Sequence, residues 1–235
     1  MKDPFIIHSI VSGLAFSAVF LLTVLGGGAG HGYGAENVVN LPAPKLEGDV
    51  SVESALSKRR SVREFTPEPL TLTEVSQLLW AAQGVTSRRG YRTAPSAGAL
   101  YPLEVYIVAG DVRDLDRGVY KYESGQHRLR RIAEGDRRRE LASAALDQSF
   151  VGRAPAVIMI SAVYERTTRK YRDRGIRYVY MEAGHAAQNI ALQAVSLNLG
   201  TVMIGAFYEN RVVKALNTPE HEEPVYLIPV GKGAS

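Results

Sequence analysis

The longest helical pattern in this chain, from about Ile176 to Leu199, constrains the fold more than any other feature. The pattern is crowded with small residues, namely Ala183, Gly184, Ala186, Ala187, Ala191 and Ala194. Small side chains let a neighbouring backbone approach closely, and little of this pattern is suited to contact with water. The sequence therefore predicts a central helix that the rest of the domain packs around and that a second subunit can approach.

An uninterrupted apolar run, Ala156–Ala162, predicts a strand that is covered on both of its faces. Further strands are expected at Leu103–Ala109, Gly118–Tyr122, His127–Ile132, Thr201–Ile204 and Val225–Val230, and further helices at Val52–Lys58, Leu72–Ala82, Arg137–Leu146 and Glu209–Leu216. These strands and helices do not follow a strict strand–helix–strand order. The sequence therefore predicts an α+β fold.

The composition of the 235 residues, 46% hydrophobic and 22% charged, is that of a globular protein with one core. The chain contains no cysteine, which excludes disulfides, thiolate catalysis and cysteine-ligated metal clusters. The net charge of +4 is too modest to require a nucleic-acid partner. The adjacent residues His221, Glu222 and Glu223 lie in a proline-bounded loop and rarely converge on one ion in such a setting, so no metal site is expected.

The N-terminal part has the pattern of a leader. Lys2 precedes a mostly apolar run, Phe5–Leu25, and small residues follow, with a cleavage position after Ala29. Residues 1–30 are expected to be a signal peptide, or an uncleaved membrane anchor through residues 5–25. Residues 31–50 are expected to be a flexible tether, and residues 51–235 the folded domain. This pattern favours an exported or membrane-anchored protein, and a tether that faces the cytosol stays open.

Three arginines and a serine stand close together at Arg59, Arg60, Ser61 and Arg63. In an extended segment the side chains of Arg59, Ser61 and Arg63 point to one side and that of Arg60 to the other. Guanidinium groups bind a phosphate dianion through two parallel hydrogen bonds. The segment is therefore a candidate phosphate site, and a solvated charged turn is the alternative interpretation.

Two further segments favour contact with a flat ligand. Thr93–Pro102 places small residues between two prolines and just before a strand, and Gly98 permits close approach of a ligand to the backbone. Gly200–Phe207 has glycines on both sides of a short apolar strand. Each segment alone is also compatible with an ordinary turn.

In this order, these segments resemble the nitroreductase family of flavin enzymes, in its SagB-type, azoline-oxidase-like branch. The resemblance rests on RRSVREF (Arg59–Phe65), LLWAAQG (Leu78–Gly84), APSAGALYPLEVY (Ala94–Tyr106), MEAGHAAQN (Met181–Asn189) and MIGAF (Met203–Phe207). It implies the nitroreductase fold, in which helices flank a central, mainly antiparallel sheet. It also implies an intertwined homodimer with FMN at the subunit interface.

The same resemblance implies an FMN-dependent oxidoreductase that transfers hydride at the flavin N5. NAD(P)H or another donor would reduce FMN, and an organic acceptor would reoxidise it in ping-pong exchange. The implied FMN-binding residues are Arg59, Arg60, Ser61 and Arg63 for the phosphate and ribityl chain, Pro95, Ser96 and Ala97 for the flavin of the other subunit, Gly205 and Ala206 near N5, and Lys232 at the phosphate.

The pair Lys170 and Tyr171 resembles a catalytic pair of azoline oxidases, in which the two side chains assist proton removal from a peptide heterocycle. This resemblance keeps a second enzyme hypothesis open, an azoline oxidase that forms aromatic azoles in a ribosomal peptide. The substrate is thus a small molecule or a peptide. A non-enzymatic module that binds polyanions through basic residues is the third hypothesis.

Overall fold

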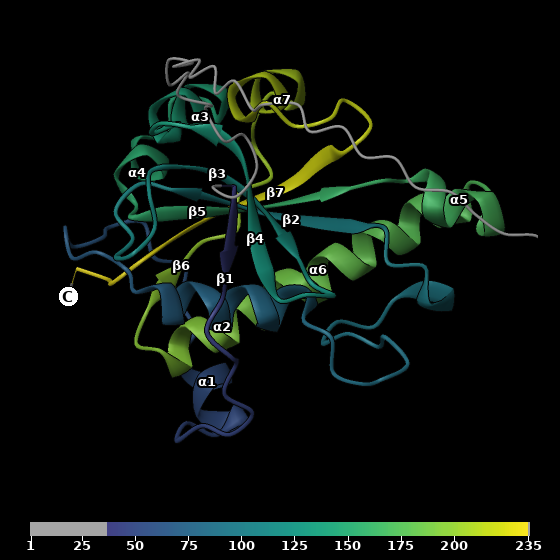
Figure 1. Cartoon of the computed structure of the whole chain (residues 1–235), viewed down its shortest axis with the longest axis horizontal. Helices are drawn as coiled ribbons and strands as arrows, with labels where there is room; N and C mark the ends of the chain where they lie inside the picture. The colour runs from purple at the N-terminus through teal and green to yellow at the C-terminus, as the bar shows by residue number, and fades with distance from the viewer. Residues whose placement is uncertain (1–36, 235) are drawn as a thin grey trace, which may run out of the picture. The chain divides into compact units, whose positions relative to one another are not determined.

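The computed structural model describes residues 37–234, and Figure 1 shows their arrangement. The expected leader, residues 1–30, lies outside the described residues. A seven-stranded sheet with the order β1-β4-β3-β2-β5-β7-β6 forms the centre, and each pair of neighbouring strands is antiparallel. The strands are β1 (Val38–Asn40), β2 (Leu103–Ala109), β3 (Gly118–Glu123), β4 (Arg128–Glu134), β5 (Ala156–Ala162), β6 (Gly200–Thr201) and β7 (Glu223–Gly231). The α+β prediction is confirmed.

Helices cover both faces of this sheet. They are α1 (Val52–Lys58), α2 (Leu72–Gln83), α3 (Arg138–Ala144), α4 (Ser149–Arg153), α5 (Glu165–Tyr171), α6 (Arg174–Ser196) and α7 (Glu209–Leu216), with a short 3-10 helix at Ala97–Ala99. In Figure 1, α3, α4 and α7 lie above the sheet, and α1, α2 and α6 lie below it. Two buried cores, one on each face, hold the layers together.

Every residue of strand β5 is buried, which explains why its sequence is apolar throughout. Ile158 and Ile160 belong to the core beneath α2 and α6, whereas Val157 and Met159 belong to the core beneath α3, α4 and α7. Alternate side chains of a strand point to opposite faces, so a strand covered on both faces needs apolar residues at every position. The prediction from the uninterrupted run is confirmed.

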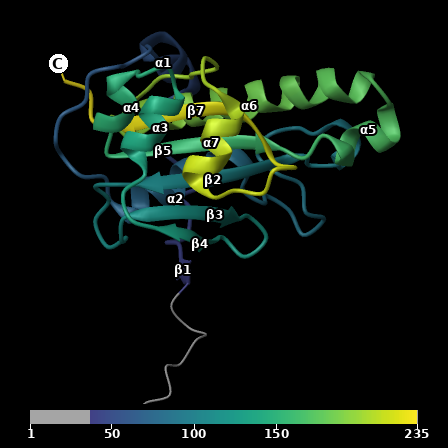
Figure 2. The same cartoon turned by 90° about the horizontal axis from the view of Figure 1, so that it is seen from above.

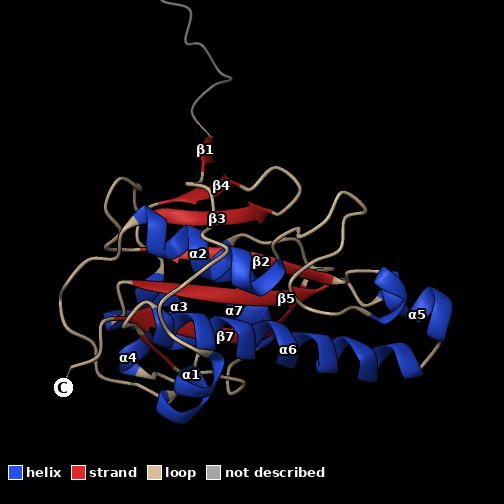
Figure 3. Ribbon diagram, turned by 90° about the horizontal axis from the view of Figure 1, so that it is seen from below, coloured by secondary structure: helices blue, strands red, loops and turns tan. Residues whose placement is uncertain are grey.

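Helix α6 is the central helix that the small residues predict. Its alanines from Ala183 to Ala194 are buried against α2 and the sheet. At a rise of 1.5 Å per residue, its 23 residues span roughly 35 Å. Figures 2 and 3 show that the first turns of α6 extend past the sheet, together with α5. No helix within residues 37–234 combines the length and apolar character that crossing a membrane requires.

The segment expected to be a flexible tether is part of the fold from residue 37 onward. Strand β1 pairs with β4 at the edge of the sheet, and Leu41 is buried. The Ser76 hydroxyl donates to the Pro42 carbonyl at 2.6 Å, and the Lys45 amide donates to the Gln77 side chain at 2.8 Å. The tether prediction is therefore wrong for residues 37–50. Their sequence has no apolar periodicity, but side chains of α2 form hydrogen bonds with their backbone and hold them in place.

Candidate functional site

The arginine segment, residues 59–63, leaves the end of α1 and runs beside β6. The Val62 amide donates to the Thr201 carbonyl at 3.0 Å, and Ser61 forms a parallel bridge with the same residue. This close approach depends on Gly200, because a Cβ atom there would lie 2.7 Å from the Val62 side chain. The sheet edge thus fixes the backbone of the arginine segment.

The C-terminal residues bind the chain directly after this segment. The Thr66 amide donates to the Lys232 carbonyl at 2.9 Å, and the Ala234 amide donates to the Glu64 carbonyl at 3.0 Å. Lys232 therefore lies next to the arginine segment, as a phosphate ligand would have to. Its ammonium is paired with Glu68 at 2.9 Å.

The basic side chains of the segment fall on two sides. The Arg60 guanidinium donates to the carbonyls of Ser57 at 2.9 Å and Arg59 at 2.8 Å, and so caps the C-terminal end of α1. It also lines a groove of about 340 Å³ beside Asn198. Arg63 instead lies over the ring of Phe150 in α4, with 5.9 Å between the guanidinium carbon and the ring centroid. The alternation expected of an extended segment is therefore visible in the contacts of Arg60 and Arg63.

The turn at Gly205 and Ala206 connects to the same region through the start of α4. The Gln148 side chain donates to the Ala206 carbonyl at 3.1 Å, two residues before the phenyl ring that Arg63 covers. Gly205 and Ala206 are both exposed. A Cβ atom at Gly205 would meet no atom within 4 Å, so the space beside this turn is open to a ring.

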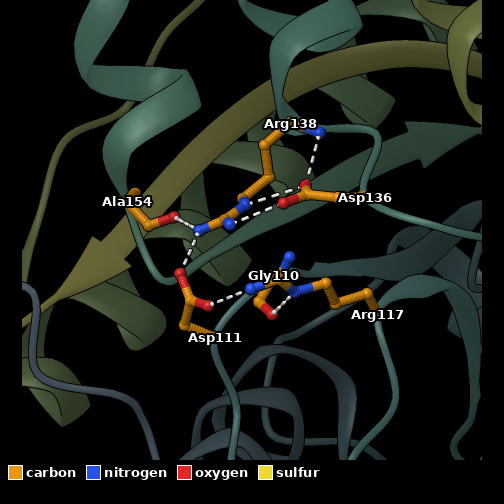
Figure 4. Close-up of polar contacts among 6 residues, drawn as sticks. All are labelled: Gly110, Asp111, Arg117, Asp136, Arg138 and Ala154. Carbon is orange, nitrogen blue, oxygen red and sulfur yellow. Dashed lines mark hydrogen bonds and ion pairs between the residues drawn. The ribbon is translucent and has the colours of Figure 1, made fainter.

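A buried arginine fixes the position of α4 (Figure 4). Arg138 donates to the Ala154 carbonyl at 2.8 Å, just after α4, and to Asp111 at 2.9 Å, just after β2. Its other nitrogens bind Asp136 at 2.9 and 2.6 Å, and these hydrogen bonds lower the pKa of the Asp136 carboxyl. The network ties the helical layer to the end of the central strands and so holds the helix that carries Phe150.

The turn at Pro95, Ser96 and Ala97 lies beside α5. Gly98 has a φ of 65°, and a Cβ atom there would lie 2.8 Å from the Tyr171 hydroxyl and 3.0 Å from the Lys170 ammonium. The Ser96 hydroxyl accepts a hydrogen bond from the Tyr101 amide at 2.9 Å, which closes the turn. The structure therefore brings two predicted sets together, because Lys170 and Tyr171 face the turn that carries Ser96.

A buried carboxyl group beneath this turn was missed in the sequence analysis. Glu182 of α6 is 2% exposed, and burial raises its pKa to about 7. The Ser96 hydroxyl, Arg92 and the Gln83 side chain act in the opposite direction. Arg92 in turn donates to Gln83 at 2.9 Å. The sequence did contain a signal for this buried carboxyl group, because Glu182 is an acidic residue within a run of small residues in the helix.

Comparisons with known proteins identify the family and the fold. A profile of the nitroreductase family matches residues 56–232. A candidate nitroreductase of Methanocaldococcus jannaschii is 50% identical over 196 residues, which cover 83% of this chain and 98% of that protein. The chain belongs to the nitroreductase family. The crystal structure of a candidate nitroreductase from Ralstonia eutropha aligns with a TM-score of 0.75 at 32% identity, over 85% of this chain and 91% of the other, which confirms the predicted fold.

More distant relatives divide between two activities. The FMN reductase (NADPH) of Bacillus subtilis is 24% identical over 199 residues, which cover 79% of this chain and 66% of that protein. The microcin B17-processing protein McbC of Escherichia coli is 29% identical over 133 residues, which cover 54% of this chain and 48% of that protein. This chain thus corresponds to about half of McbC.

Within one chain, the two parts of the candidate site are well separated. The arginine segment contacts β6, directly after α6, whereas the Ser96 turn lies beside Glu182. From Glu182 to the end of α6 at Ser196, the helix rises by roughly 20 Å. The arginine segment, Lys232 and the Gly205 turn therefore form one group, and Pro95–Ala97 with Lys170 and Tyr171 form another.

Proposed function

We propose that this chain is an FMN-dependent oxidoreductase that moves hydride from NAD(P)H or another donor to an organic acceptor in two half-reactions. The observation that carries the proposal is the arginine segment, fixed between β6 and the C-terminal residues and linked through α4 to the open turn at Gly205. A cationic segment beside an open backbone turn fits a ligand with a phosphate tail and a flat ring. The named activity of the Bacillus subtilis relative supports both FMN and NADPH.

The phosphate would be held by Arg59, Ser61 and Arg63. Ser61 and Arg63 are exposed, so their donors can reach a ligand. Arg60 already donates to two carbonyls and would have to release one of them first, so we expect its contribution to be the smallest. Lys232 would likewise have to leave Glu68.

The ring would lie against Gly205 and Ala206, whose backbone N–H groups would be near N5. When bound, FMN supplies the hydride chemistry, and the protein supplies position and charge. Nearby N–H donors and cations stabilise negative charge on a reduced ring. No side chain of this group needs to act as an acid or a base.

The functional unit would be a homodimer in which Pro95, Ser96 and Ala97 of one subunit cover the flavin held by the arginine segment of the other. Large apolar side chains of α6 support this assembly. Ile176, Tyr180 and Met181 are exposed in the isolated chain, and contiguous exposed apolar side chains often mark an interface. A second subunit would cover part of this surface.

An azoline oxidase is the second candidate, favoured by the contact of Lys170 and Tyr171 with the Ser96 turn. In this reading the two side chains would move a proton from a peptide heterocycle bound at the turn. The relative McbC is named for the processing of microcin B17, and this supports the second candidate. Replacing Tyr171 with Phe should then abolish oxidation of an azoline peptide and leave the reduction of FMN by NADPH intact.

For the cellular location we keep the proposal of an exported or membrane-anchored protein, based on the leader pattern in residues 1–30. N-terminal sequencing of the protein from its native cells tests it. An N-terminus near residue 30 indicates export with cleavage, and an intact Met1 rules out the cleaved form.

The test of the main proposal is the binding of FMN to the purified full chain. We expect a yellow protein, and we expect Arg63→Ala to weaken FMN binding roughly ten- to hundredfold, because it removes a charge-assisted hydrogen bond. Arg139→Ala is the matched control, since Arg139 is an exposed arginine of α3. A colourless protein that takes up no added FMN, or an equal loss in both variants, contradicts the proposal.

A further inference from the structure

The positive charge of this chain is concentrated on α5 and the first turn of α6. Residues 165–177, here called the cationic arm, contain the cations Arg166, Arg169, Lys170, Arg172, Arg174 and Arg177 and the acids Glu165 and Asp173. Six cations against two acids leave an excess of four, which equals the net charge of +4 of the whole chain. The formal charges of all other residues therefore cancel.

These cations are exposed and mostly without acidic partners. Each of the six side chains belongs to an exposed residue. Among the ion pairs of residues 37–234, the cationic arm contributes one, between Arg166 and Glu104. Like charges in neighbouring helical turns destabilise a helix, so fold stability does not explain this concentration. Figures 2 and 3 show that α5 and the first turns of α6 extend from the body of the domain.

The base of the cationic arm lies at the candidate site. Arg166 donates to the Tyr101 carbonyl at 3.0 Å, at the end of the Ser96 turn. The guanidinium carbon of Arg92 lies 4.5 Å from the centroid of the Tyr101 ring. Lys170 faces Gly98 of the same turn. A molecule that approaches this turn therefore passes through the field of several fixed cations.

Apolar surface lies beside the cationic arm, and in the proposed homodimer a second subunit would cover part of it. Ile176, Tyr180 and Met181 line a shallow hollow of about 600 Å³, together with Arg177 and Asp173. A cation beside exposed apolar side chains suits an aromatic or aliphatic anion better than a small inorganic ion.

We propose that the cationic arm selects the acceptor substrate of the enzyme and favours organic acceptors that carry a carboxylate. The inference rests on the proposed oxidoreductase function and adds the substrate class. Fixed charges around a site raise the local concentration of an oppositely charged substrate and its association rate by roughly ten- to a thousandfold, and salt screens the effect. In this role the cations of the arm steer and select the acceptor and do not react with it.

The test compares a matched pair of acceptors, 4-nitrobenzoate and the neutral 4-nitrobenzamide, with the FMN-loaded full chain. The variant carries Arg169→Glu, Arg172→Glu and Arg174→Glu. The control carries Arg113→Glu, Arg139→Glu and Lys214→Glu, which change the net charge equally at exposed positions outside the cationic arm. We expect the variant to lower kcat/KM for 4-nitrobenzoate at least about tenfold at low salt, with a much smaller change for 4-nitrobenzamide.

Three controls make the outcome decisive. The arginine-to-lysine triple variant at the same positions should keep the preference for the anion. High salt should reduce the preference in the parent protein. The preference should be unchanged in the charge-matched control. An equal effect of the variant on both acceptors, or the same effect in the charge-matched control, overturns the inference.

A binding measurement separates this inference from the proposed function. Fluorescence titration of the full chain with 2-naphthoate and with the neutral 2-naphthamide needs no turnover. If the protein binds no FMN yet prefers 2-naphthoate through the cationic arm, the proposed function fails and the anion preference stands. If the variant slows reduction by NADPH relative to NADH and leaves the acceptor preference unchanged, the arm binds the phosphate of the donor, and the inference about the acceptor is overturned.

Discussion

At the residue scale, burial of the Glu182 carboxyl group lowers the stability of the fold when that group is charged. It lies in α6 beneath the Ser96 turn, and its Oε1 atom is buried without a hydrogen-bond partner within the described part of the chain. Burial disfavours the charged form, which is why its pKa is raised to about 7. The neutral form is therefore the one that the fold accommodates.

This cost predicts a pH dependence of stability. Below about pH 4.5 the group is protonated in both the folded and the unfolded state, and it has no effect. Between about pH 4.5 and 7 the unfolded state releases the proton and the folded state retains it, so the free energy of unfolding falls by about 3 kcal/mol. Glu182→Gln should remove this fall and be more stable than the parent near pH 8.

Urea unfolding at about pH 4.5 and 8 checks the prediction. Glu220→Gln, at an exposed position, should show no such difference. A stability difference between Glu182→Gln and the parent that is the same at both pH values would show that Glu182 is not protonated in the fold.

At the element scale, backbone hydrogen bonds from two neighbouring parts of the fold fix the position of the arginine segment. Strand β6 binds it at Val62, and the C-terminal residues bind the chain directly after it, at Glu64 and Thr66. Side chains that would bind a phosphate need a fixed backbone, since a misplaced donor loses most of its hydrogen-bond energy. The buried Arg138 serves the neighbouring helix α4 in the same way.

Substitution of Gly200 tests whether the arginine segment depends on its contact with β6. Gly200→Ala places a Cβ atom 2.7 Å from the Val62 side chain, so the segment must move away from β6. We expect a loss of about 1–3 kcal/mol in the free energy of unfolding together with weaker FMN binding. Gly125→Ala is the control, because a Cβ atom there would meet no atom within 4 Å. Unchanged FMN affinity in Gly200→Ala would show that the segment does not need β6.

At the scale of the whole molecule, the length of α6 separates the two groups of candidate residues. One group lies near Glu182 and the other beyond Ser196 at the end of the helix. In the proposed homodimer, each chain would therefore supply two half-sites. An assembly of two chains related by a twofold axis would join each half-site to its complement.

Mixing two inactive variants tests this assembly. One carries Arg59→Ala and Arg63→Ala, and the other carries Ala97→Trp in the Ser96 turn. If the site is shared, random hybrids regain about a quarter of the parent's FMN-dependent activity, because half of the dimers contain one intact site of two. If each chain holds its own complete site, mixing restores nothing. Sedimentation of the parent protein should show a dimer.

Several parts of this fold could be predicted from the chain alone because their signals are local. The uninterrupted apolar residues of Ala156–Ala162 indicate a strand covered on both faces, and Thr71 with Glu74 forms the capping box that starts α2. Residues 37–50 gave no such signal. Their order comes from hydrogen bonds such as Lys45 to Gln77, which lies 32 positions away in the sequence.

The sequence by itself determined the α+β class, the nitroreductase resemblance and the candidate residues. These depend on periodicity, composition and short motifs, which are properties of neighbouring residues. Only the tertiary structure decided that Lys170 and Tyr171 meet the Ser96 turn, that Glu182 is buried beneath it and that the arginine segment lies at the far end of α6. The physical reason is that burial and hydrogen-bond partners arise between distant segments, where packing sets the geometry and no local pattern encodes it.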